Sequence, residues 1–134
     1  MELGYRVPIV VAADDDALRR LLVRVLGDAG HIVEPVADGH ELLHRMRASI
    51  WPCVALLSLS RSRLNSHAVL AAVAAEEALA RGHGYILLTA LWDALPGDYA
   101  TVIRDLSVVV VPKPFDLDGL VEAVARAANR VIAA

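Results

Sequence analysis

The chain has 134 residues, 57% of them apolar, and a net charge of −3, which is enough for one domain with a substantial core. Its apolar residues fall in short blocks divided by glycine, proline and charge, and none approaches the roughly 18–20 residues that a membrane-spanning helix requires. The slightly acidic charge disfavours nucleic acid as the main partner, and the single cysteine, Cys53, excludes an internal disulfide framework and fits the reducing cytoplasm.

Strand and helix patterns alternate along the whole chain. In chain order they predict a strand at Val7–Ala12, a helix that ends before Gly30, a strand at Ile32–Val36, a helix at about His40–Arg47, a strand at Val54–Ser58, a helix at about His67–Ala80, a strand at Tyr85–Thr89, a helix beginning near Pro96 within Leu91–Leu106, a strand at Val108–Val111 and a helix at about Leu117–Ile132. Asp15 or Asp16 is placed to cap the first helix, and Asp116 is placed to cap the last.

The strands in the second half of the chain are nearly continuous apolar runs. A parallel sheet that helices cover on both faces requires such runs. Pro35 cannot donate to a sheet ladder, so its strand should lie at an edge. The alternation therefore predicts a doubly wound α/β fold. The chain ends with its last predicted helix, so we expect one domain over residues 1–134 and no output domain.

Polar residues follow four of the predicted strands. They are Asp14-Asp15-Asp16 after the first strand, Ser58 at the end of the third, Thr89 at the end of the fourth and Lys113-Pro114 after the fifth. This set of positions, in register over nearly the whole chain, resembles the receiver domain of bacterial response regulators. The resemblance implies a flavodoxin-like, five-stranded parallel sheet of order 2-1-3-4-5 with five helices. It also implies a functional site at the carboxyl ends of the strands.

In that family, two acids after the first strand and an aspartate ending the third hold Mg²⁺. The aspartate accepts a phosphoryl group, whose oxygens contact a threonine and a lysine. The resemblance places these residues of the chain in that pocket: Ala13, Asp14, Asp15, Ser58, Thr89 and Lys113. The register of the first helix puts Ala13 in place of the first acid, and Ser58 replaces the phosphoacceptor. Asp14 and Lys113 alone sum to zero charge and can pair, so we expect a degenerate pocket with no Mg²⁺ and no other cofactor.

The function that this pattern predicts is that of a stand-alone atypical receiver, or pseudo-receiver. It would bind a protein partner in bacterial signal transduction without being phosphorylated. We expect no enzymatic activity, because a serine hydroxyl is a poor nucleophile without an activating base. The expected partner is a two-component protein, such as a histidine kinase or another regulator, or a second copy of the chain. We expect a cytoplasmic protein with no nucleic-acid or membrane partner. The alternative is a phosphotransfer receiver that uses a displaced acid, Asp14 or Asp15.

The contact surface usual in the family is formed by the fourth helix, the fifth strand and the fifth helix. Candidate interface residues on the corresponding elements here are Trp92, Leu95, Arg104, Arg126 and Arg130. Charged residues around an apolar centre are typical of interfaces, and the centre often carries most of the binding energy. The sequence leaves open whether Trp92 instead packs over the degenerate pocket.

A second motif, HELLH at residues 40–44, matches the helix of zinc proteases. His40 and His44, at i and i+4, share one helix face and can bind Zn²⁺, with the glutamate between them as base. Loose candidates for the third ligand that zinc requires are His67, Glu76 and Glu77. The same segment resembles the ordinary start of a receiver's second helix, with Leu42, Leu43 and Met46 turned inward. We therefore expect solvated histidines, and a zinc hydrolase is the remote alternative.

Overall fold

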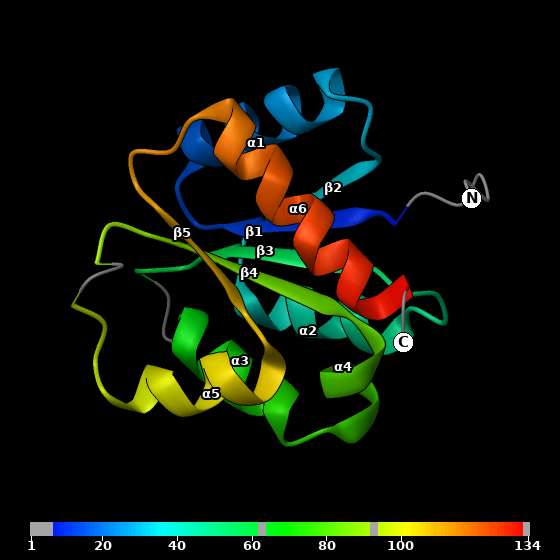
Figure 1. Cartoon of the computed structure of the whole chain (residues 1–134), viewed down its shortest axis with the longest axis vertical. Coiled ribbons are helices and arrows are strands. Elements are labelled where there is room, and N and C mark those ends of the chain that lie inside the picture. Colours follow the sequence, from blue (N-terminus) through cyan, green and yellow to red (C-terminus); the bar gives the residue numbers. More distant parts are fainter. Residues whose placement is uncertain (1–6, 62–63, 92–93, 133–134) are drawn as a thin grey trace.

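A computed structural model describes residues 7–61, 64–91 and 94–132, without the side chain of residue 132. Five parallel strands form one sheet with helices on both faces (Figure 1). The elements are β1 (Ile9–Ala13), α1 (Asp16–Asp28), β2 (Val33–Val36), α2 (Gly39–Ala48), β3 (Val54–Ser58), α3 (Ser66–Ala74), α4 (Glu77–Gly82), β4 (Gly84–Thr89), α5 (Asp98–Leu106), β5 (Val109–Pro112) and α6 (Leu117–Ile132). None of the helices in the described ranges is both long and apolar enough to cross a bilayer.

The strand order is β2-β1-β3-β4-β5, which confirms the predicted topology. β2 is an edge strand, and its Pro35 lies opposite Val11 of β1. An edge strand has one side without a ladder partner, so a residue that lacks an N–H is tolerated there. β3 covers the predicted residues, and the other strands differ from the prediction by one or two residues at their ends.

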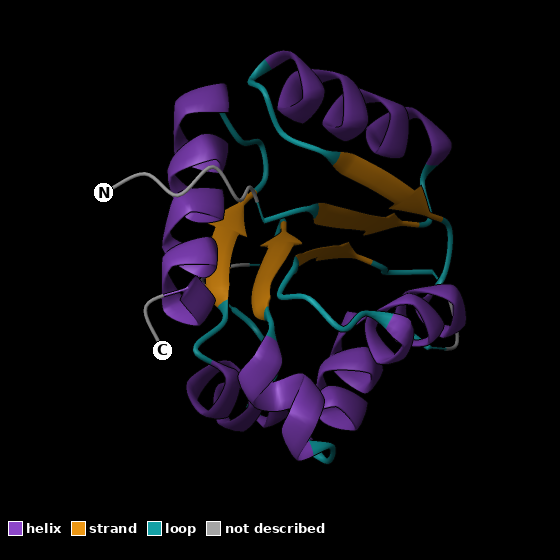
Figure 2. Cartoon of the chain, turned by 90° about the vertical axis from the view of Figure 1, so that its right-hand side faces the viewer, coloured by secondary structure: helices purple, strands orange, loops and turns teal. Residues whose placement is uncertain are grey.

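The sheet separates two hydrophobic cores (Figure 2). Successive strand residues face opposite sides of a sheet, so Val10 packs with α2 to α5 and Ile9 packs with α1 and α6. All five residues of β3 are buried, which explains the uninterrupted apolar run in the sequence. Burying each large aliphatic side chain contributes roughly 1.5–3 kcal/mol before the entropy cost of folding is subtracted.

Short polar side chains cap four of the described helices, and Asn65 does so for α3 by accepting the Ala68 N–H at 2.9 Å. Asp15 Oδ1 accepts the Leu18 N–H at 2.9 Å at the start of α1, so Asp15 is the cap and Asp16 is the first helical residue. Asp38 caps α2 by accepting the Glu41 N–H at 2.8 Å. Asp116, placed as predicted, accepts the Gly119 N–H at 2.6 Å before α6. Caps of this kind contribute about 1 kcal/mol each.

The prediction of one helix at His67–Ala80 is wrong, because the segment forms two helices, α3 and α4. Six helices therefore occur among the described residues instead of the five expected. Glu76 lies at the break in an extended conformation, with φ −114° and ψ 108°. Its carboxylate accepts hydrogen bonds from Arg47 of α2, the shortest at 2.6 Å. After the break, α4 places Leu79 in the core. The helix propensity of an alanine-rich segment depends on that segment alone, so it could not predict a break that involves contacts with other elements.

Two buried residues, Cys53 before β3 and His83 before β4, form a hydrogen bond at the edge of the sheet where the strands begin. His83 Nδ1 accepts the backbone N–H of Cys53 at 3.1 Å. Burial lowers the pKa of His83 and raises the pKa of Cys53 to about 11, so both side chains are neutral at physiological pH. Cys53 is a buried core residue. His83 was not singled out from the sequence, because a lone histidine before a strand carries no local pattern.

Candidate functional site

The polar strand ends meet at one edge of the sheet. Because neighbouring parallel strands end together, Ala13 of β1 lies opposite Ser58 of β3, and Thr89 of β4 lies opposite Pro112 of β5. Lys113 follows directly, and its backbone N–H donates to the Thr89 carbonyl at 2.9 Å. The structure thus brings the predicted pocket residues to the same edge, from four different strands.

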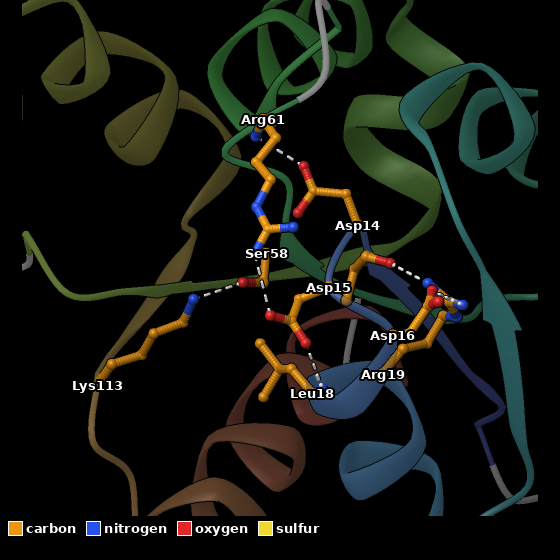
Figure 3. A network of polar contacts seen from close by, with 9 residues as sticks. Asp14, Asp15, Asp16, Leu18, Arg19, Ser58, Arg61 and Lys113 are labelled. Atoms are coloured by element: carbon orange, nitrogen blue, oxygen red, sulfur yellow. Dashed lines mark hydrogen bonds and ion pairs between the residues drawn. The ribbon is translucent and has the colours of Figure 1, made fainter.

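Lys113 and Ser58 form a direct side-chain contact at this edge (Figure 3). Lys113 Nζ donates to Ser58 Oγ at 2.7 Å. Ser58 is buried, with 4% of its surface exposed, while Lys113 is half-buried. Among the described residues, this hydroxyl is the side-chain partner of the ammonium group. A neutral oxygen therefore meets the lysine where a carboxylate would form an ion pair.

The two acids after β1 contact Arg61 instead of Lys113. Asp14 Oδ2 accepts the backbone N–H of Arg61 at 2.7 Å, and the Arg61 guanidinium lies 3.2 Å from Asp15 Oδ2. The hydrogen bond from the Leu18 N–H and, to a smaller degree, the charge of Arg61 lower the pKa of Asp15. The described hydrogen bonds of Asp14 and Lys113 thus go to Arg61 and Ser58. Sequence reasoning missed Arg61, because its partners lie 46 and 47 positions earlier in the chain.

The residues at this edge do not fit a Mg²⁺ site. Ala13 offers no side-chain oxygen, and Ser58 offers a neutral hydroxyl that already accepts from Lys113. Arg61 contacts both remaining acids through its backbone N–H and its guanidinium, so these carboxylates offer a divalent cation less negative charge than free ones would. In the part of the chain that the structure describes, no three His, Cys, Asp or Glu side chains cluster in a way that could hold a metal ion.

The HELLH segment lies on α2 as expected, with Leu42, Leu43 and Met46 buried and both histidines exposed. The three candidate third ligands have partners elsewhere. His67 Nε2 lies 3.5 Å from Asp98 Oδ2, Glu76 binds Arg47 and Glu77 pairs with Arg81. The structure therefore gives no support to the zinc hydrolase alternative.

We expect the His40→Ala and His44→Ala variants each to change the free energy of unfolding by less than about 0.5 kcal/mol, because exposed substitutions rarely do more. Met46→Ala on the same helix is the matched control and should cost about 2–5 kcal/mol, because it leaves a cavity in the core. Urea denaturation measures all three variants. Stoichiometric zinc in protein prepared without a metal column, lost in both histidine variants, would contradict the expectation.

The candidate interface residues have different environments. Trp92 lies outside the described residues. Leu95 is half-buried and packs against the core beneath α3 and α5, whereas Arg104 is exposed and lies 3.5 Å from Asp105. Arg126 is exposed on α6 beside a hollow of about 220 Å³.

Arg130 differs from the other candidates because it makes contacts inside the molecule. Its guanidinium donates to the carbonyl oxygens of His83 at 2.7 Å and Ala80 at 3.1 Å. These hydrogen bonds tie α6 to the turn between α4 and β4. The side chain is half-buried and supports the fold, so it is a weaker interface candidate than Arg104 or Arg126.

Solved structures of the same fold cover nearly the whole chain, although no family model and no curated protein matches it. A response regulator receiver domain protein from Methanospirillum hungatei JF-1 has 19% identity and a TM-score of 0.81, over 97% of this chain and 100% of that chain. A sensor protein from Polaromonas sp. JS666 has 19% identity and a TM-score of 0.80, over 95% and 99%. The receiver domain of Francisella response regulator 1452 has 19% identity and a TM-score of 0.77, over 93% and 98%. The chain therefore has the fold of receiver domains.

Proposed function

We propose that the chain is a receiver-type domain that binds a protein partner in bacterial signal transduction without being phosphorylated. The observation that carries the proposal is the 2.7 Å hydrogen bond from Lys113 Nζ to Ser58 Oγ. In the receiver domains that the chain resembles, the third strand ends in the phosphoacceptor aspartate, and the lysine contacts the phosphoryl oxygens. Here the lysine has a neutral partner within the chain, so its ammonium makes a side-chain hydrogen bond without a phosphoryl group.

The contacts of the nearby nucleophile candidates support this proposal over phosphotransfer through a displaced acid. The partner of Ser58 Oγ is the Lys113 ammonium, which cannot act as a base toward the hydroxyl. Asp15 caps α1 and also contacts Arg61, and its lowered pKa makes its carboxylate a weaker nucleophile. Asp14 holds the Arg61 backbone N–H.

The proposed partner is a protein of a two-component system, such as a histidine kinase or another regulator, or a second copy of the chain. The similar solved structures, which include receiver domains and a sensor protein, support this class of partner. The proposal places the protein in the cytoplasm, with neither nucleic acid nor a membrane as its partner. The fold and the slight negative charge are consistent with this placement.

Acetyl phosphate with Mg²⁺ is expected to leave the protein without an added phosphoryl group, because Lys113 donates to the hydroxyl of Ser58, which no base activates among the described contacts. Intact-mass spectrometry measures the modification, and a receiver that has its acceptor aspartate serves as the positive control. We expect Ser58→Asp alone to remain unmodified, because Ala13 still deprives a metal of a ligand. A phosphoryl group on Asp14, Asp15 or Ser58 would contradict the proposal. One mapped to Asp14 or Asp15 would favour the displaced-acid alternative, and one mapped to Ser58 would show that this hydroxyl is the acceptor.

The Arg126→Glu variant is expected to weaken association at least about tenfold, because a charge reversal on an interface repels groups that the arginine attracts. Light scattering and cross-linking over a protein concentration series measure self-association, and binding to a captured partner is measured in parallel. Arg24→Glu is the control, since Arg24 is exposed on α1, which packs on β1 and β2 away from β5. Equal behaviour of the two variants and the unaltered protein would place the interface elsewhere.

A further inference from the structure

A cavity of about 460 Å³ lies beside the hydrogen bond between Lys113 and Ser58. The ends of β3 and β4 and the residue after β5 form one side of it, and the first residues of α3 and α5 form the other. Every residue that we assign to its wall belongs to the described part of the chain. Small-molecule pockets span roughly 300–1,000 Å³, so this cavity is large enough for an organic ligand.

The polar side of the cavity presents hydrogen-bond donors. The ammonium of Lys113 has three hydrogens and donates one of them to Ser58 Oγ. Ser58 accepts that bond and keeps its own hydroxyl hydrogen. Thr89 Oγ1 accepts the Leu91 N–H at 3.0 Å, so its hydroxyl hydrogen also remains available. Three donors from three strand ends can therefore converge on one acceptor group of a ligand.

In the described part of the chain, the side-chain hydrogen bond of Lys113 goes to the neutral hydroxyl of Ser58, and its charge also lowers the pKa of Asp15. Both acids after β1 contact Arg61. Asp98 lies on the helical side of the cavity with its side chain 66% exposed, and its Oδ2 lies 3.5 Å from Nε2 of His67. Lys113 is the half-buried cation of the described cavity wall, and a singly charged anionic group placed against its ammonium would pair with it, while the carboxylate of Asp98 stays in water.

The helical side of the cavity is apolar and aromatic. Leu95 and Tyr99 are half-buried and pack against the core beneath them. The ring of His67 lies edge-on to Tyr99, with 4.9 Å between the ring centroids. Leu91 also lines the cavity and is 57% exposed. An apolar ligand group placed against these side chains would remove apolar surface from water.

We propose that this cavity binds a small monocarboxylate with an aromatic or branched apolar body, without a covalent bond. The carboxylate accepts from Lys113, Ser58 and Thr89, and the apolar body packs against Leu95 and Tyr99. A dianionic phosphate ester fits less well, because the described cavity wall has no second Lys or Arg to pair with its second charge, and Asp98 of that wall repels it. The inference goes beyond the proposed function and does not depend on it, because it concerns a ligand and neither phosphotransfer nor a partner.

The test is a heteronuclear NMR titration of the labelled protein with three probes of one shape: naphthylacetate, naphthylacetamide and naphthyl phosphate. We expect saturable shifts of the backbone amides of Thr89, Leu91 and Tyr99 with naphthylacetate. Its Kd should be at least about tenfold lower than that of the neutral amide, since hydrogen bonds to a charged group exceed those to a neutral one by about that factor. Its Kd should also be lower than that of the phosphate.

Lys113→Met, which keeps the length of the side chain and removes its charge, should raise the Kd for naphthylacetate at least about tenfold and leave that for naphthylacetamide unchanged. Arg104→Met is the control, because Arg104 is an exposed cation on α5 outside the cavity wall, and it should change neither value. If Lys113→Met does not fold, the ranking of the three probes by the unaltered protein still decides the question.

Three results would overturn the proposal. One is the absence of saturable shifts with naphthylacetate, and another is equal affinity for the acid and the amide. The third is tighter binding of naphthyl phosphate, which would assign the cavity to phosphate esters. The acetyl phosphate experiment detects a covalent modification and this titration detects reversible binding, so failure of one is distinguishable from failure of the other.

Discussion

Mg²⁺ at about 10 mM is expected to raise the melting temperature of an Ala13→Asp/Ser58→Asp double variant by several degrees and to leave that of the unaltered protein unchanged. Positions 13 and 58 lie opposite each other on β1 and β3, beside Asp14, so the double variant would bring three carboxylates to one strand edge. If the double variant binds Mg²⁺ with a Kd of about 1 mM, this concentration adds about 1.4 kcal/mol of stability. A domain of this size converts that free energy to roughly 3–6 °C.

Each variant is compared with itself with and without Mg²⁺, so the cost of burying a carboxylate at position 13 cancels. This matters because Ala13 is fully buried in the unaltered protein. The two single variants are the matched controls and should respond less than the double variant. A Mg²⁺-dependent rise in the melting temperature of the unaltered protein that Asp14→Ala abolishes would refute our account of the charges at this edge.

Replacing Gly84 with alanine is expected to destabilise the protein by about 3 kcal/mol, at the upper end of the usual cost of overpacking. Gly84 begins β4, and a Cβ atom built there would lie 2.4 Å from the Ala127 carbonyl oxygen and 2.9 Å from the Ala127 carbonyl carbon of α6. Both of these atoms are backbone, so no side-chain rotation relieves the clash. Either α6 must move away from the sheet or β4 must shift in its ladder.

Gly82→Ala is the control for that measurement, because a Cβ atom at Gly82 meets nothing within 4 Å. Gly82 is the last residue of α4, where alanine should stabilise by up to about 1 kcal/mol. Urea denaturation midpoints, compared at equal m-values, measure both variants. Equal stabilities of the two variants would show that α6 does not pack against the start of β4 as described.

Local patterns in the sequence were sufficient for the strands, and the family resemblance implied their order. The apolar run that ends at Ser58 predicted β3 with its observed bounds, and Pro35 predicted the edge strand. Asp116 was recognised as a cap because capping joins residues three apart. The position of Ser58, Thr89 and Lys113 at one edge followed from the topology, since parallel strands end together. Each of these features depends on the repeat of one element or on the order of the strands.

The contacts that define the site were decided by the tertiary structure. Lys113 meets Ser58 across 55 positions of sequence, and Arg61 reaches Asp14 across 47. Glu76 ends α3 through Arg47, 29 positions away. A periodic pattern reports which face of its own element is buried, but it does not report which residue of another element lies opposite. The sequence by itself therefore determined the fold and placed Ser58 at the end of β3, while only the packing of separate elements decided which partners the remaining polar groups and the cavity walls have.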